Sequence, residues 1–438
     1  MTLAQVQDGD VIERTRIASV PDAFTARNGF LYGLLGLPLA FVALPLYVIL
    51  PNHYAREFGM SLGLLGAILL GARLFDAFID PFLGRLSDRL FARSARAVLA
   101  LGATAALVLA AGFTLLFFPL VRSPASLAVW AGVMLVITYA AYSALSVSHQ
   151  SWGAMLGGDE TQRSRIVAWR EGLGLVGVVL ASITPIALGL PASTALFFVA
   201  LVAGWLAWRR APRPVARKTG AAVPVSGLWI PLRHTAFRRL LAVFMLNGIA
   251  SAVPATLVLF FIQDRLQAAA TMEPVFLGSY FVSAALSIPL WLALVKRIGL
   301  AHTWLVGMLL AIAVFAWATQ LSAGDTASFV LVCALSGVAL GTDLALPGAM
   351  LAGLIQAHGQ SGQSEGAYFG WWNFATKLNL ALAAGLALPM LGLFGYVPGT
   401  RDASALAALV IAYCVLPCVL KLAAAATLYF SIIQPGKP

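Results

Sequence analysis

Three ionisable residues lie one helical turn apart inside a long apolar run. Arg73, Asp76 and Asp80 are separated by three and four positions, which places them on one face of a helix. Two carboxylates at this spacing repel each other when both are ionised, so a cation, a proton or Arg73 must offset their charge. An ionisable group at bilayer depth costs at least ~2.5–3.5 kcal/mol and normally faces a bundle interior or a watery cavity. The cluster is a candidate cation or proton site, and a static Arg–Asp pair that fixes helix packing is the alternative.

Two further charges lie deep in later apolar runs. Asp343 is near the middle of the run 327–355, and Lys377 lies inside the run 367–394. Neighbouring antiparallel helices can bring these two together as a structural salt bridge. The alternative is that Lys377 binds an anionic or hydroxyl-rich substrate, or couples to Asp76 and Asp80. The sequence leaves both interpretations open.

A second polar group lies around the fourth and fifth apolar runs. Arg170 and Glu171 open the fifth run, and adjacent residues on a helix face different directions, so we expect them to have different partners. Arg170 is expected to point into a central cavity. The fourth run adds hydroxyl and amide groups at Tyr142, Ser143, Ser146 and Gln150. The residues that we expect to bind the substrate are Arg73, Tyr142, Ser146, Gln150, Arg170, Asp343 and Lys377.

The composition is that of a membrane protein, so we expect membrane-spanning helices to position these groups. Of the 438 residues, 61% are hydrophobic and 10% charged, whereas soluble domains are about 25% charged. A membrane helix needs about 20 apolar residues, and the apolar runs of that length predict an all-α membrane protein with twelve spans. The longest connection, 209–237, divides them into six plus six, which predicts two pseudo-symmetric six-helix bundles. The spans are about 30–50, 61–83, 97–119, 127–149, 172–190, 192–208, 238–262, 275–295, 300–321, 327–355, 367–394 and 404–430. The predicted domains are a tail 1–29, a bundle 30–208, a linker 209–237, a bundle 238–430 and a tail 431–438.

The net charge of +11 reflects topology and not a nucleic-acid partner. Most of the 28 Lys and Arg residues fall in loops on one side of the predicted spans, which favours a cell-membrane protein with both termini in the cytoplasm. There is no Gly-rich phosphate loop, His-Glu-x-x-His or nucleophile elbow, so we expect neither an enzyme, nor a cofactor, nor ATP-driven transport. The three cysteines all lie in apolar runs, which favours packing over a disulfide or metal site. The expected partners are a small-molecule substrate and the lipid bilayer, with the chain acting as a monomer.

The run from Arg73 to Arg89 resembles the second-helix signature of the glycoside–pentoside–hexuronide:cation symporters, the melibiose permease family of the major facilitator superfamily. The resemblance implies secondary transport by alternating access, with Asp76, Asp80 and Ser143 binding a proton or sodium ion. It further implies that Arg170 lies in the cavity and that Lys377 links the substrate and cation sites. Within the same run and just after it, the resemblance assigns a latch, which holds the helices of one half in the outward-open state, to Gly84, Asp88, Arg89 and Arg93.

Departures from the family pattern affect which ion and which class of substrate we expect the chain to bind. The sodium-using pattern has Asn where this chain has Ile79, which leaves a poorer sodium shell and favours a proton. Ala40, Ser146 and Gln150 replace two acidic residues and a tryptophan that hold galactosides in that family. We therefore expect no galactoside site of the family type in this chain. The substrate is then a different sugar, a less hydroxylated solute or an amphiphile. Two alternatives remain: a lipid or lysolipid transporter with a largely apolar second half, and a non-transporting receptor or assembly factor.

Overall fold

The computed structural model describes residues 24–60, 62–214, 227–396 and 399–434, and this part of the chain forms helices and loops without a strand. The first half contains α1 (Ala26–Gly33), α2 (Gly36–Leu44), η1 (Pro45–Ile49), α3 (Leu50–Glu57), α4 (Leu62–Arg93), α5 (Ala95–Phe117), α6 (Pro124–Met155), α7 (Glu160–Ala187) and α8 (Gly189–Arg210). The second half contains α9 (Ile230–Arg233), α10 (Thr235–Phe260), η2 (Phe261–Arg265), η3 (Ala270–Met272), α11 (Glu273–Ala318), α12 (Thr326–Ala357), α13 (Glu365–Leu393), α14 (Ala403–Val410), η4 (Ile411–Val415), α15 (Leu416–Leu428) and η5 (Tyr429–Ile433).

Short polar residues begin several of these helices. The Ser94 hydroxyl accepts a hydrogen bond from the Ala97 amide, so a single residue separates α4 from α5. Asp159 accepts in the same way from the Gln162 amide and starts α7. Each side chain satisfies one of the amides that the first helical turn leaves without a partner. Long apolar helices can therefore follow one another with very short connections.

Each of the twelve predicted spans corresponds to a helix or to a run of consecutive helices. Among the described residues, nine helices are long and apolar enough to cross a membrane; α4 and α13 are not among the nine. One of the nine, α11, covers two predicted spans, 275–295 and 300–321. It breaks at Gly299, whose φ of 78° lies in the left-handed region that favours glycine. Within the predicted tails and linker, residues 1–23, 215–226 and 435–438 lie outside the described part. The predicted linker 209–237 contains α9 and the start of α10.

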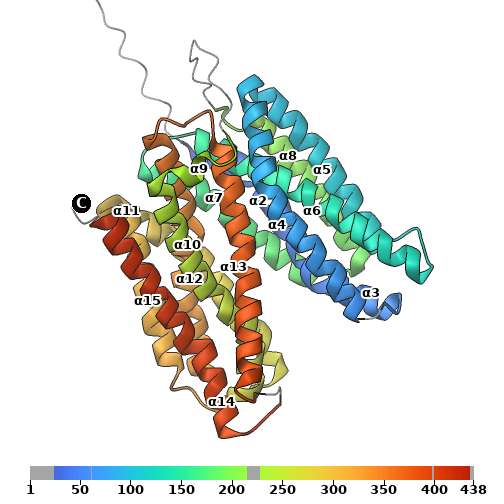
Figure 1. The fold of residues 1–438 in the computed structure, drawn as a ribbon, viewed down its shortest axis with the longest axis vertical. Helices are drawn as coiled ribbons and strands as arrows, with labels where there is room; N and C mark the ends of the chain where they lie inside the picture. The colour runs from blue at the N-terminus through green and yellow to red at the C-terminus, as the bar shows by residue number, and fades with distance from the viewer. Residues whose placement is uncertain (1–23, 61, 215–226, 397–398, 435–438) are drawn as a thin grey trace, which may run out of the picture.

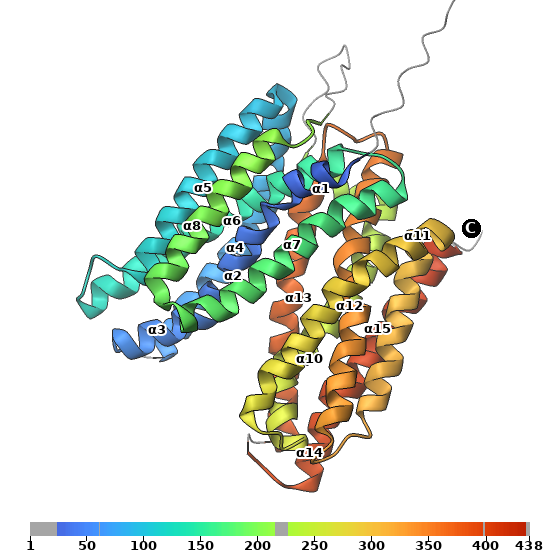
Figure 2. The same ribbon diagram turned by 180° about the vertical axis from the view of Figure 1, so that it is seen from behind.

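The helices form two groups that diverge from one end of the molecule. A buried apolar cluster in the first half is built from residues between Phe24 and Ala211. Two further clusters are built mainly from the second half. Figures 1 and 2 show the two groups lying together at the end where α1 begins and η5 ends, and separating toward α3 and α14. We call these the terminal end and the distal end.

The two groups meet through glycines on α4 and α13. A Cβ atom placed on Gly84 would lie 1.9 Å from the Gly366 carbonyl oxygen, and one on Gly370 would lie 2.6 Å from the Asp80 carbonyl oxygen. Only residues without a side chain allow two backbones to approach so closely. This contact sets the distance from which side chains of α13 reach α4.

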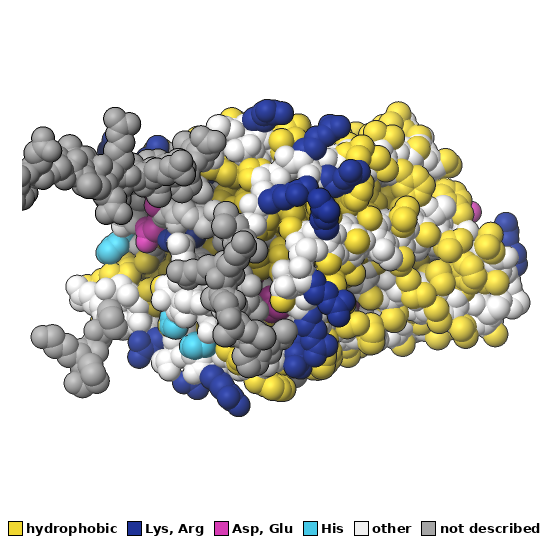
Figure 3. Space-filling view, turned by 90° about the horizontal axis from the view of Figure 1, so that it is seen from above, with side chains coloured by type: hydrophobic (Ala, Val, Ile, Leu, Met, Phe, Trp, Pro, Cys, Tyr) yellow, Lys and Arg dark blue, Asp and Glu magenta, His cyan; other side chains and the backbone are white. Residues whose placement is uncertain are grey.

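Basic side chains gather at the terminal end. Figure 3 views the molecule from this end and shows Lys and Arg side chains beside a broad apolar surface, partly covered by atoms that are not described. A concentration of Lys and Arg on one side of a membrane protein is typical of its cytoplasmic side.

Candidate functional site

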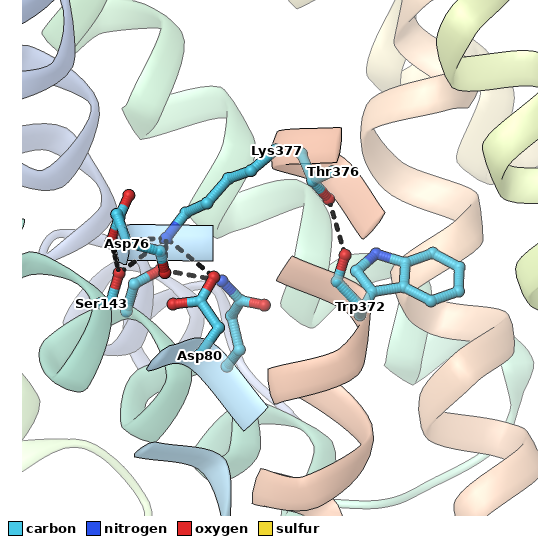
Figure 4. Close-up of polar contacts among 8 residues, drawn as sticks. Asp76, Asp80, Ser143, Trp372, Thr376 and Lys377 are labelled. Carbon is cyan, nitrogen blue, oxygen red and sulfur yellow. Dashed lines mark hydrogen bonds and ion pairs between the residues drawn. The ribbon is translucent and has the colours of Figure 1, made fainter. Parts of the chain in front are cut away.

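The first candidate site joins α4, α6 and α13 around one ammonium group. The Nζ atom of Lys377 lies 2.7 Å from Asp76 Oδ1 and 2.7 Å from Asp80 Oδ2. It also donates a 2.8 Å hydrogen bond to the Ser143 hydroxyl, which in turn donates a 2.7 Å bond to Asp76 Oδ1. Figure 4 shows the Lys377 side chain extending from α13 to a position between these three groups. We call Asp76, Asp80, Ser143 and Lys377 the carboxylate cluster.

The carboxylate cluster carries more negative than positive charge when its members are ionised. Asp76 and Asp80 are 2% and 0% exposed, so water contributes little to their stabilisation. Lys377 offsets one of the two charges. Asp80 Oδ1 is buried and has no hydrogen-bond partner among the described residues. A buried polar atom without a partner is costly, which makes this oxygen the natural place for one further positive charge.

The predicted members of this site come together, with one change of partner. Lys377 meets Asp76 and Asp80, so the alternative in which it couples to that pair is favoured by the geometry. The salt bridge between Lys377 and Asp343 is wrong, because Asp343 pairs with Lys421 at 3.0 Å. The cation that lies between Asp76 and Asp80 is thus Lys377, whereas Arg73 is exposed on α4.

The second polar group surrounds Asp343 in the middle of the second half. Asp343 Oδ1 accepts from the Asn247 amide at 2.9 Å and from the Trp304 indole at 2.8 Å. Its Oδ2 accepts from the Ser251 hydroxyl at 3.3 Å and from Lys421 at 3.0 Å. Lys421 also donates to Asn247 Oδ1 at 2.7 Å. This network, the Asp343 network, ties α10, α11, α12 and α15 together.

A cavity of about 390 Å³ opens beside the Asp343 network, between α10, α11, α12 and the η4–α15 helix. Its walls are mostly apolar and aromatic, and Asp343 and Lys421 are the charged residues among those that line it. The sequence did not predict Lys421 as a site residue. The signal was present, because a lysine in the last apolar run needs a partner as much as Asp343 does.

The third polar group lies between the halves toward the terminal end. Gln150 donates to the Ser146 hydroxyl at 2.9 Å, and Gln150 and Arg170 line a small cavity of about 10 Å³, room for about one water. The prediction that Arg170 and Glu171 have different partners is wrong, since Arg170 Nε donates to Glu171 Oε1 at 2.9 Å. Tyr142 is partly buried on α6.

Tyr32 and His149 form a buried pair beside this third group. The Tyr32 hydroxyl donates to the His149 carbonyl oxygen at 3.1 Å, and the two rings stack at 4.4 Å. His149 is completely buried. The pair fixes α1 against α6 and so holds one wall of the small cavity.

Asp88 connects the two halves at the terminal end. Its carboxylate accepts a 2.6 Å hydrogen bond from the Gly366 amide and a 2.8 Å bond from the Ala367 amide. These amides belong to the first turn of α13, whose positive dipole end favours an anion. The resemblance implied a latch within one half, whereas this contact crosses between the halves. Arg89 and Arg93 are exposed and form no ion pair within the described ranges.

A second carboxylate acts in the same region. Glu160 at the start of α7 accepts a 3.1 Å hydrogen bond from the Leu300 amide, which the break at Gly299 leaves without a helical partner. Arg163 adds a 2.8 Å hydrogen bond to Gln356 on α12. Three contacts from the first half therefore hold the second half at the terminal end.

Twelve spans in two six-helix bundles, joined at one end and carrying charges in their interior, are the major facilitator fold. Solved structures of similar fold include a bacterial homologue of the iron transporter ferroportin in an outward-facing state, with 17% identity, a TM-score of 0.66 and coverage of 92% of this chain and 98% of that one. The fucose:proton symporter FucP of Escherichia coli is similar with 14% identity, a TM-score of 0.65 and coverage of 91% and 98%.

The sequence comparisons narrow this class. The family model described as MFS/sugar transport protein matches residues 30–434, and the chain belongs to that family, whose members are transporters and not enzymes. A curated relative, the candidate glycoside/cation symporter YagG of Escherichia coli strain K12, is 26% identical over 160 residues. That match covers 36% of this chain and about a third, 34%, of the relative.

Proposed function

We propose that this chain is a secondary active transporter that couples proton movement to the symport of a small organic solute, either a sugar or a less hydroxylated organic compound. The observation that carries the proposal is the position of the Lys377 ammonium between Asp76 and Asp80, with one carboxylate oxygen left unpartnered in the described part of the chain. A glycoside/cation symporter and a fucose:proton symporter among the similar proteins support cation coupling.

A proton fits this cluster better than a sodium ion. The ammonium lies within 2.8 Å of an oxygen from each of Asp76, Asp80 and Ser143, the three groups expected to ligate a cation. A sodium ion would have to displace it or approach a like charge at close range. A proton needs only the Asp80 Oδ1 atom. Arg73, three positions before Asp76 on α4, adds positive charge near the cluster and further disfavours a metal cation.

Protonation of Asp80 would change how the two halves are joined. Lys377 belongs to α13 and its carboxylates to α4, so their ion pairs cross between the halves. Neutralising Asp80 removes one of the two ion pairs and loosens the bridge. A ligand shifts a conformational equilibrium only by its differential affinity for the two states. The proton is such a ligand here, because the bridge to Lys377 exists only while α4 and α13 are in contact.

We infer the membrane topology from the distribution of Lys and Arg, and the conformational state from the contacts between the two halves. The terminal end is rich in Lys and Arg, so both termini are assigned to the cytoplasm of a cell-membrane protein. The contacts of Asp88 and Glu160 then close the cytoplasmic side, as in an outward-facing state. We assign the two domains to residues 30–208 and 238–430, with a monomer as the working unit.

Proteoliposomes test the proposal. We would load vesicles so that either an inside-alkaline pH gradient or an inward sodium gradient is present, and measure accumulation of radiolabelled L-fucose, D-xylose, D-galactose, D-glucuronate and 2-naphthylacetamide. We expect accumulation driven by the pH gradient and lost in Asp80→Asn and Asp76→Asn, with downhill equilibration retained. Asp325→Asn, which removes an exposed carboxylate at the distal end, is the matched control. Normal accumulation in both cluster variants, or accumulation driven by sodium alone, would contradict the assignment.

One observation favours a second candidate function, lysolipid transport. The 390 Å³ cavity in the second half has mostly apolar walls, and Leu259 and Leu277 on its lining are 43% and 38% exposed. Transfer of a fluorescent lysophosphatidylcholine from donor vesicles into proteoliposomes, faster than into protein-free vesicles, is the result that this candidate requires.

A further inference from the structure

The cavity in the second half has mostly apolar walls and two charged lining residues, Asp343 and Lys421, which we call its floor. Leu259 on α10 and Leu277 on α11 are exposed, whereas Asp343 and Lys421 have side chains that are 15% and 6% exposed. Its volume of about 390 Å³ is within the range of sites for small organic molecules. Its aromatic lining consists of Phe276, Tyr280, Phe281, Phe315 and Tyr413.

The floor of this cavity can donate a hydrogen bond but has little capacity to accept one. Asp343 already receives four donors, two on each oxygen, which fills the acceptor positions of a carboxylate. Lys421 has three protons and uses two of them within the described part of the chain, on Asn247 and Asp343. One ammonium proton therefore remains for a ligand that lies against the floor.

This lining favours a ligand with fewer hydroxyl groups than a sugar. A sugar has many hydroxyl groups that each need a partner, whereas most of the lining is apolar or aromatic and its carboxylate is saturated by protein donors. Burial of apolar ligand surface against the aromatic walls instead contributes favourable binding free energy. A ligand that fits both parts has an apolar or aromatic body and a single accepting group at one end.

We infer that this cavity binds a compact apolar compound with one hydrogen-bond-accepting head, a carboxylate or a carbonyl, which Lys421 contacts at the floor. The inference rests on the proposed function, because it names the substrate class of a transporter. It adds a site in the second half that is separate from the carboxylate cluster of α4, α6 and α13. Asp343 holds Lys421 in place and is a positioning residue.

Four probes separate the head group from the body. They are 2-naphthylacetate, 2-naphthylacetamide, 2-(2-naphthyl)ethylamine and D-glucuronate, added to the purified chain in lipid nanodiscs without any gradient. The first measurement is the shift in melting temperature. The second is alkylation of Cys333, which lines the cavity, by N-ethylmaleimide in a Cys414→Ala, Cys418→Ala background that leaves it the single thiol of the chain.

The expected result is selective for the accepting head. The acetate and the acetamide raise the melting temperature and slow alkylation of Cys333 about tenfold at ten times their Kd. The ethylamine and the glucuronate do neither. Protection by the acetamide but not by the acetate identifies a carbonyl head, and the reverse identifies a carboxylate. Equal protection by the ethylamine, or protection by glucuronate alone, would overturn the inference.

Matched variants control for partition of the probes into lipid. Ala339→Phe places a ring in the cavity and is expected to abolish the shift and the protection, whereas Leu331→Phe, on the exposed face of the same helix, leaves both intact. The double variant Lys421→Met with Asp343→Asn removes the donor without leaving a buried charge unpaired, and is expected to lose binding of both accepting probes. Binding that survives Ala339→Phe or the double variant would refute the site.

The outcome is distinguishable from failure of the proposed function. Probe binding is measured on the unsubstituted chain without any gradient, so its result does not depend on whether Asp80 couples transport to a proton. If Asp80→Asn accumulates substrate normally while the probes still bind, proton coupling alone is refuted. If accumulation depends on Asp80 but the probes do not bind, the cavity site alone is refuted.

Discussion

Replacing Asp88 with asparagine removes the carboxylate that ties α4 to the first turn of α13. The substituted side chain retains one accepting oxygen, but its amide nitrogen would face the Ala367 N–H that now donates at 2.8 Å, donor against donor. A hydrogen bond to a charged group contributes about 1.5–3 kcal/mol, and Asp88 is only 2% exposed. Losing one such bond and the attraction to the helix dipole destabilises the joined arrangement by about 2 kcal/mol. This corresponds to a roughly 30-fold shift away from it.

Distances between spin labels measure this shift. Cysteines at Glu57 on α3 and Ser404 on α14, both exposed at the distal end, would carry the labels in a background without native cysteines. In Asp88→Asn we expect the long distance at the distal end to lose population to a shorter one. Asp325→Asn is the matched control, because Asp325 also accepts from a backbone amide but only within the second half. An unchanged distance distribution in Asp88→Asn would refute the latch.

Three further predictions concern the same contacts and the Asp343 network. Gly84→Ala would place a methyl group 1.9 Å from the Gly366 carbonyl oxygen and is expected to separate α4 from α13, seen as the same shift in spin-label distances. Glu160→Gln weakens a 3.1 Å hydrogen bond and is expected to shift that distribution less than Asp88→Asn does. Lys421→Met leaves Asp343 buried without its cation and is expected to cost about 3–5 kcal/mol, measured as a lower melting temperature, most of which Asp343→Asn restores in the double variant.

Apolar runs located the predicted spans because lipid imposes a length and a polarity on each helix, although α4 and α13 are not among the nine helices that meet both requirements in the described part. The same runs also located Asp76 and Asp80, since charges in apolar runs stand out. The partner of that pair was harder to choose, because Lys377 lies 301 positions beyond Asp76 and only helix packing brings them together. Two interpretations of Lys377 were equally compatible with its sequence position, and the contact of α4 with α13 decided between them.

The wrong partners have specific physical reasons. A salt bridge between Asp343 and Lys377 was one of two alternatives, because the two are on consecutive spans, yet Asp343 pairs with Lys421 on the last span. Arg170 and Glu171 were given separate partners from their directions on a helix. Both have long side chains, and Arg170 bends back to its neighbour at 2.9 Å. The cavity beside Asp343 had no sequence signal, since its lining comes from four helices.

Infrared difference spectroscopy at two pH values tests the central claim most directly, because it observes whether Asp80 takes up a proton and requires no substrate. The account predicts that a protonated-carboxyl band appears as the pH is lowered, is absent in Asp80→Asn, and remains in Asp343→Asn. Sodium at constant pH should leave the band unchanged. A sodium-dependent carboxylate change at constant pH, with no proton uptake at Asp80, would contradict the claim.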